Sequence, residues 1–261
     1  GAMVVAGYDT LESSPSTNLD CGLWSAIGVD KTAGKPVIVY YDATNRNLML
    51  ATAASDTAYP VNSNSPVYAA NGTAPSAQGD GWTRQTIGDT NLRLGQYVSL
   101  VLDAGNNLHI ACFDGKGGDL YYFYGERSAY GTYTFTQSLV DGDGSVGTWT
   151  DIKLTNESAS GYAAGPVISY VDATNVKSED GLKVAYLNAT GIAKTAGAEL
   201  TLADWETATA PCKSSVEDNR VTLAVGVTDG ASLNTTAKAD NCKLALAYVS
   251  SRFDCVYLRN E

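Results

Sequence analysis

The sequence has little of what common metal and catalytic sites need. It contains one histidine and no Cys-x-x-Cys pair. Structural zinc sites take several Cys and His ligands at short spacings, so a site of that kind is excluded and we expect no metal and no cofactor. A Gly-rich phosphate loop, a Gly-x-Ser-x-Gly elbow and a His-Glu-x-x-His pair are also missing, so no catalytic residue is assigned.

Positive charge is scarce as well. The chain has 17 Lys and Arg against 28 Asp and Glu, a formal net charge of −11, and its basic residues form no cluster. Such a surface repels the phosphates of nucleic acids and anionic lipids. No apolar run approaches the roughly 20 residues needed to span a bilayer. We therefore expect neither nucleic acid as a partner nor membrane insertion.

Five cysteines leave at least one thiol free, because disulfides use them in pairs. Cys112 lies in the apolar run IACF and is predicted to be a buried free thiol. The other four allow up to two disulfides, and their spacing does not decide the pairing.

Glycine (26) and tyrosine (16) are abundant, which is typical of many short strands joined by tight turns. A nine-residue pattern, strand A, occurs at 22–30, 95–103 and 147–155, with glycine first and an aromatic residue third. A fourth copy at 219–227 keeps only the apolar run. Strand B follows each copy of strand A, at 37–44, 109–116, 167–174 and 245–252. Strand C follows each strand B, at 47–53, 119–124, 181–187 and 254–259.

A fourth strand, D, precedes each strand A and begins with an aromatic residue. Fifteen residues separate Trp82 from Tyr97, and 16 separate Tyr133 from Trp149 and Trp205 from Val221. Tyr8 precedes Trp24 by 16 residues, so the N-terminus supplies the remaining D strand.

The spacing predicts an all-β fold: a four-bladed β-propeller of four-stranded antiparallel blades, closed by the N-terminal strand pairing with the C-terminal blade. We expect one domain over 1–261, with blades at about 22–89, 95–140, 147–210 and 219–259 plus 4–14. The main alternative is part of a larger propeller, which is expected to leave an open interface.

The second copy carries a family resemblance. Its motif is Gly95-x-Tyr97-x-Ser99-Leu100, then Asp103-x-Gly105-Asn106-x-x-His109-Ile110-x-x-x-Asp114 and Gly118-Asp119-Leu120-x-Tyr122. It resembles the repeat of bacterial secreted or surface β-propellers of the lectin and sialidase-like types. The resemblance implies a propeller and an extracytoplasmic location: secreted, on the cell surface or in the periplasm. The sialidase Asp-box is not present, and the resemblance implies no activity.

Seven residues are candidates for ligand binding. Three aromatic residues share the third position of strand A, where rings lining a channel mouth suit stacking on a sugar or a peptide side chain. Three aspartates share the B–C turn, where each either joins a carboxylate rim or caps its own turn. The seventh, an aspartate on the third strand A, has no charged equivalent at that position of the first two copies. The seven are Trp24, Tyr97, Trp149, Asp42, Asp114, Asp172 and Asp151.

These observations favour a non-enzymatic binding or scaffold module that holds a protein or glycan on one face of the propeller. The competing hypothesis is a glycoside hydrolase or lyase that uses carboxylates at the channel mouth, with Asp114, Asp151 or Asp172 as the acids. His109 begins a B strand, and we interpret it as a structural residue that holds a turn.

Overall fold

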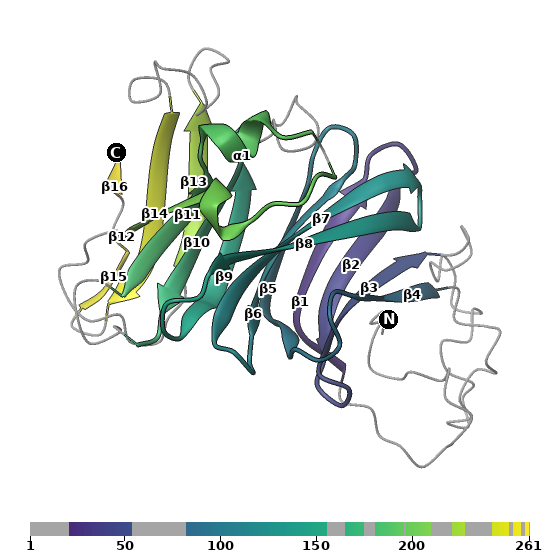
Figure 1. Ribbon diagram of the computed structural model, residues 1–261, viewed down its shortest axis with the longest axis horizontal. Coiled ribbons are helices and arrows are strands. Elements are labelled where there is room, and N and C mark those ends of the chain that lie inside the picture. Colours follow the sequence, from purple (N-terminus) through teal and green to yellow (C-terminus); the bar gives the residue numbers. More distant parts are fainter. Residues whose placement is uncertain are drawn as a thin grey trace.

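The fold is a row of four antiparallel sheets (Figure 1). The computed structural model describes residues 21–53, 82–155, 165–174, 181–195, 197–209, 221–227, 242–250, 253–256 and 259–260. Three sheets run from first to last strand in chain order. Sheet 1 comprises β1 (Cys21–Asp30), β2 (Lys35–Asp42), β3 (Asn47–Ala53) and β4 (Trp82–Ile87). Sheet 2 comprises β5 (Leu94–Leu102), β6 (Leu108–Asp114), β7 (Asp119–Ala129) and β8 (Thr132–Asp141).

Sheet 3 comprises β9 (Val146–Leu154), β10 (Pro166–Asp172), β11 (Leu182–Leu187) and β12 (Trp205–Thr209). Between its last two strands lie helix α1 (Ala189–Ala193), whose first turn is capped by Asn188 Oδ1, and the short 3-10 helix η3 (Leu202–Asp204). Sheet 4 comprises β13 (Val221–Val227), β14 (Cys242–Ser250) and β15 (Phe253–Val256), with β16 (Arg259–Asn260) also pairing with β14.

The prediction of an all-β fold with a repeated antiparallel sheet is confirmed, and strands A to D of the sequence are the successive strands of sheets 1 to 3. Closure of the ring is a separate matter. Sheets 1 and 4 lie at opposite ends of the row in Figure 1. The N-terminal strand expected at 4–14 lies outside the described residues, so its pairing stays a prediction.

The fourth strand A is one residue out of register with our alignment. In sheets 1 to 3 the fifth residue of strand A pairs with the third residue of strand B. The pairs are Ala26 with Val39, Ser99 with Ala111 and Asp151 with Ser169. The equivalent of these partners in sheet 4 is Ala247, which pairs with Thr222 and not with Leu223. Over the described residues 221–227 the pairing of β13 with β14 is regular, so the expected match of Val221 with Trp24 is wrong by one position.

Successive sheets pack in one direction through their first strands, since β1 contacts β5, β5 contacts β9 and β9 contacts β13. We call the side of a first strand that faces the next sheet its front face and the other its back face. Gly28 belongs to the front of sheet 1: a Cβ there would collide with Leu102 Cδ1, on the back of sheet 2. Ser99 on the front of sheet 2 contacts Thr150 on the back of sheet 3, with 2.9 Å between their hydroxyl oxygens.

Two apolar clusters fill the space between the sheets. One joins sheets 1 and 2 through residues such as Val39, Leu48 and Ile110, and it contains Cys112. The other joins sheets 2 and 3 through Tyr122, Ile152 and Tyr170. Cys112 is a buried free thiol, as predicted, and burial raises its pKa to about 12. Among the described helices, none is long and apolar enough to cross a membrane.

Candidate functional site

The first strands of sheets 1, 2 and 3 begin with a double irregularity that the Gly-x-aromatic motif produces. Each pairing shows two register shifts at this end of the strand. The glycines have φ values of 91° to 109°, and the aromatic residues two positions later have φ values of 45° to 55°. The glycines are Gly22, Gly95 and Gly147, and the aromatic residues are Trp24, Tyr97 and Trp149.

Glycine is needed here because the strand passes very close to the preceding sheet. A Cβ on Gly95 would lie 3.1 Å from Leu48 Cα, and one on Gly147 would lie 2.9 Å from Leu120 Cα. Leu48 and Leu120 hold equivalent places near the start of the third strands of sheets 1 and 2. The repeated glycine is therefore a packing requirement between sheets.

The three aromatic side chains form one continuous row across three sheets. The centroid of the Tyr97 ring lies 4.9 Å from that of Trp24 and 4.9 Å from that of Trp149, with tilted planes. Tyr41 extends the row beside Trp24, and Phe113 beside Tyr97. All three first-strand rings are partly exposed. We call Trp24, Tyr97 and Trp149 the aromatic row.

The backbone beneath this row is strained and fixed. A non-glycine residue with positive φ costs about 1–3 kcal/mol and persists only where its surroundings hold it. The Thr150 hydroxyl donates to the Tyr97 carbonyl oxygen, so the Ser99 hydroxyl is the donor in the Ser99–Thr150 contact. A side chain of sheet 3 thus holds the central residue of the row, which belongs to sheet 2.

The three turn aspartates cap their own turns. Asp42 Oδ1 accepts the backbone N–H groups of Thr44 and Asn45 at 2.9 and 3.0 Å. Asp172 Oδ1 accepts the N–H of Thr174 at 2.9 Å, and its other oxygen lies 3.6 Å from Lys183 Nζ. Both carboxylates are buried.

Asp114 accepts hydrogen bonds from three backbone N–H groups. Its Oδ1 accepts the N–H groups of Arg93 and Lys116, at 2.8 and 2.9 Å, and its Oδ2 accepts that of Gly117 at 2.9 Å. The side chain has no exposed surface. Of the two readings open in the sequence, this geometry supports turn capping.

Asp151 also has a partner. Its carboxylate pairs with Lys153 Nζ at 2.6 Å, two residues along β9 on the front face of sheet 3. Asp151 follows Trp149 by two residues along β9, and both members of the ion pair are partly exposed. The pair can therefore offer a hydrogen-bond donor and an acceptor to a ligand.

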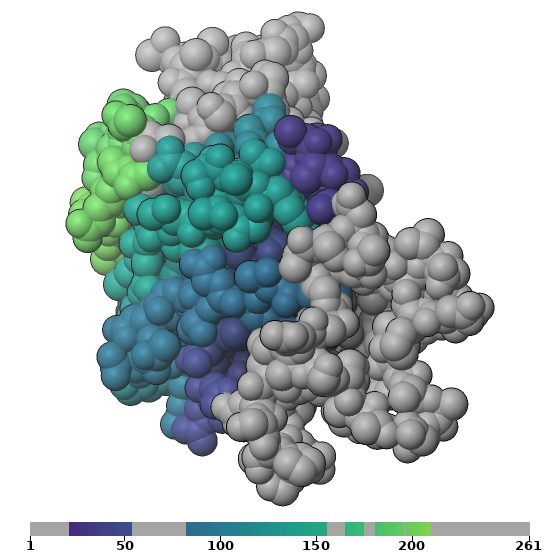
Figure 2. All heavy atoms as spheres, turned by 90° about the vertical axis from the view of Figure 1, so that its right-hand side faces the viewer, coloured from purple at the N-terminus to yellow at the C-terminus, as the bar shows by residue number. Residues whose placement is uncertain are grey.

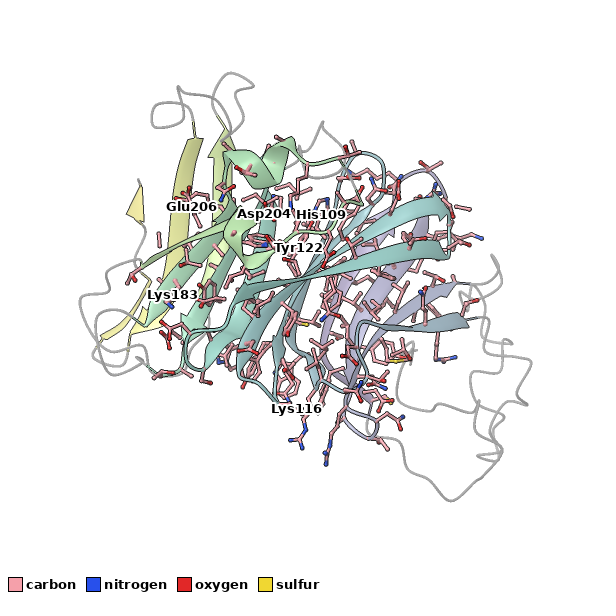
Figure 3. The ribbon with its side chains drawn as sticks, viewed as in Figure 1. His109, Lys116, Tyr122, Lys183, Asp204 and Glu206 are labelled. Atoms are coloured by element: carbon pink, nitrogen blue, oxygen red, sulfur yellow. The ribbon has the colours of Figure 1, made fainter. Side chains whose placement is uncertain are left out.

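His109 is fully buried in the interior and is not part of the aromatic row. It packs against Tyr122 between the sheets, with His109 Nδ1 2.7 Å from the Tyr122 hydroxyl (Figure 3). Its Nε2 lies 3.6 Å from Asp103 Oδ2. Burial lowers the pKa of His109 below its usual 6.5, and the nearby Asp103 carboxylate only partly offsets that effect.

This histidine predicts a pH dependence of stability. The unfolded chain takes up a proton near pH 6.5 and the folded chain only at a lower pH, so the unfolded state binds more protons in between. We expect the free energy of unfolding to fall as the pH drops from about 6.5 to 5, by at most about 1.4 kcal/mol per pH unit. Urea denaturation at several pH values measures it.

The control is His109→Gln, which removes the chain's single histidine. Its free energy of unfolding should change less over the same pH range. Identical pH profiles for the two proteins would contradict the prediction.

Sequence reasoning missed two features near this end of the sheets. Tyr41 and Phe113 flank the row, and the signal was available, since both directly precede the turn aspartate of their repeats. The second is a polar link between sheets 2 and 3, in which Asp141 accepts a hydrogen bond from Tyr170 at 2.6 Å and pairs with Lys183 at 3.0 Å. Neither the spacing nor the repeat marks these partners.

No group of three or more His, Cys, Asp or Glu side chains within the described ranges is arranged to hold a metal ion. The site is therefore an aromatic row with a neighbouring ion pair, built on strained first strands. Compared with known proteins, the chain matches no family model and no curated protein.

Proposed function

We propose that this protein is a non-enzymatic extracytoplasmic module that uses the aromatic row to hold a glycan or a protein side chain. The observation that carries the proposal is the row itself. Three partly exposed rings from three sheets lie with neighbouring centroids 4.9 Å apart, and each ring belongs to a residue with a strained, positive φ. Aromatic rings bind sugar faces and apolar side chains at little entropic cost, because each ring has only two rotatable bonds.

The extracytoplasmic setting in this proposal rests on the repeat of the second copy, which resembles secreted and surface propellers. The acidic charge of −11 suits a partner other than nucleic acid. The finer fold belongs to the same proposal: the four sheets are blades of a β-propeller. Its support is the common strand order of sheets 1 to 3 and the adjacency of successive first strands. A four-bladed ring closed by residues 4–14 is one form of it.

The test is a binding screen against a glycan array and against extracts of bacterial surface proteins. Replacing Trp24, Tyr97 and Trp149 together with alanine should weaken binding of any ligand found by at least about 100-fold, because hot-spot aromatic residues each contribute about 2 kcal/mol or more. Isothermal titration measures the change, and circular dichroism checks the fold.

Tyr186→Ala is the matched control, since Tyr186 is another partly exposed aromatic residue and belongs to β11, outside the row. It should leave the affinity unchanged. Equal affinities for the wild-type protein and the folded triple variant would remove the aromatic row from the function.

The competing hydrolase or lyase hypothesis has weaker support. Asp114 and Asp172 are buried turn caps, and Asp151 is paired with Lys153. A screen with chromogenic glycosides decides the point: turnover that Asp151→Asn abolishes would favour the enzyme, and no turnover on a broad panel is the result we expect.

A further inference from the structure

The aromatic row carries hydrogen-bond donors that a ligand can use. Trp24 and Trp149 each have an indole N–H group, and Tyr97 has a hydroxyl group. Among the residues that the structure describes, none accepts a hydrogen bond from these three groups, and none of the three is a buried polar atom that lacks a partner. All three side chains are partly exposed, so a ligand that lies on the row can accept from them.

The carboxylates near the row are already occupied. Both oxygens of Asp42 and both oxygens of Asp114 accept hydrogen bonds from protein groups. Asp151 pairs with Lys153 at 2.6 Å. The row therefore offers more donors than acceptors. A sugar hydroxyl is both a donor and an acceptor, so this balance favours a ligand that accepts hydrogen bonds and donates none.

The rings of the row are inclined to one another. The planes of Trp24 and Tyr97 meet at 45°, and those of Tyr97 and Trp149 meet at 51°. Rings at these angles leave wedge-shaped spaces between neighbouring faces and do not form the single flat platform that suits a sugar face. Grooves between aromatic rings are where proline-rich segments dock, because the compact pyrrolidine ring fits between them.

The spacing of the rings leads to the same ligand. Tyr97 lies 4.9 Å from each tryptophan, so the two tryptophan centroids are at most 9.8 Å apart. A polyproline II helix has three residues per turn and rises about 3.1 Å per residue, so prolines three residues apart are separated by about 9.3 Å on one side of the helix. One turn of such a helix can therefore place a proline against each tryptophan.

We infer that the aromatic row binds a proline-rich segment of a partner protein in the polyproline II conformation. Its pyrrolidine rings lie between the aromatic rings, and its carbonyl oxygens accept hydrogen bonds from the indole N–H groups of Trp24 and Trp149. Proline has no backbone N–H, and the carbonyl groups of a polyproline II helix make no internal hydrogen bonds, so the ligand supplies acceptors alone. The inference rests on the proposed function, of which it names the ligand class.

Titration of the intact protein with decaproline tests the inference by calorimetry, which should show saturable binding. Trp24→Phe and Trp149→Phe each keep an apolar ring and remove one N–H donor. Each should weaken binding about tenfold, because one hydrogen bond and part of the contact area are lost. A decapeptide of glycine and serine, which lacks the pyrrolidine rings and is flexible, should not bind.

Leu202→Ala is the matched control, since Leu202 is an apolar residue with 52% exposure and should not affect binding. β11 begins at the end of sheet 3 that holds Trp149, and η3 follows the opposite end of β11. The segment that contains η3 is the green surface at the upper left of Figure 2.

Two results would overturn the inference. One is the lack of decaproline binding at millimolar concentration, and the other is equal affinity for decaproline in the wild-type protein and both folded phenylalanine variants. Cellohexaose, a neutral oligosaccharide, separates this outcome from a failure of the proposed function. If cellohexaose binds, decaproline does not, and the triple alanine variant loses the oligosaccharide, then the row holds a glycan: the proposed function stands and the proline-rich ligand is wrong.

Discussion

Replacing Gly147 with alanine is expected to destabilise the protein by about 3 kcal/mol. A side chain at φ +104° is disfavoured by about 1–2 kcal/mol, and its Cβ would lie 2.9 Å from the Cα of Leu120 in the preceding sheet. The obstacle is backbone and cannot rotate away, so overpacking adds about 1–3 kcal/mol. Urea denaturation measures the loss.

Gly34→Ala is the matched control for this prediction. Gly34 also has a positive φ, +65°, but a Cβ there would meet nothing within 4 Å. Its loss should be about 1 kcal/mol, from the backbone conformation alone. Similar losses at the two positions would mean that the close approach of the sheets does not explain the repeated glycine.

Replacing Asp114 with alanine should cost about 4 kcal/mol. The carboxylate is fully buried and accepts hydrogen bonds from three backbone N–H groups, and hydrogen bonds to a charged group contribute about 1.5–3 kcal/mol each. The donors belong to exposed residues, so water replaces part of what is lost. Asp114→Asn keeps one acceptor oxygen for two of the donors and should lose about half as much. The shift in the urea midpoint gives both values.

Asp143→Ala, at an exposed aspartate two residues beyond the end of β8, serves as the control and should leave the midpoint nearly unchanged. The experiment also separates the two roles considered for the turn aspartates. If Asp114→Ala kept full stability but lost ligand binding, the carboxylate would act on the ligand and not on its turn.

The strand repeat could be predicted from the sequence because strands A and D each begin with a recognisable residue pattern. The leading aromatic residue predicts that a D strand begins at Trp82, and β4 begins there. The Gly-x-aromatic pattern placed Trp24, Tyr97 and Trp149 at one repeat position, and the structure brings their rings together. In both cases the information is contained in a few neighbouring residues.

What sequence reasoning missed depends on distant partners or on backbone conformation. Nothing near Asp141 in the chain indicates that Tyr170 and Lys183 will reach it from the next sheet. The positive φ of the aromatic residues was not foreseen, because bulky side chains rarely adopt it. Without those irregularities the alignment of β13 slipped by one residue, since a regular strand and a bulged strand of equal length pair differently.

The single direction of packing has a consequence for how such a protein can change in size. The first strands β5 and β9 meet the preceding sheet with large residues on their back faces, and Gly95 and Gly147 make the same close approach to that sheet. Each sheet therefore presents one packing surface to the sheet before it and another to the sheet after it. Gene duplication can therefore lengthen the row where the facing residues of two sheets fit, and the angle between adjacent sheets limits how many sheets complete the circle.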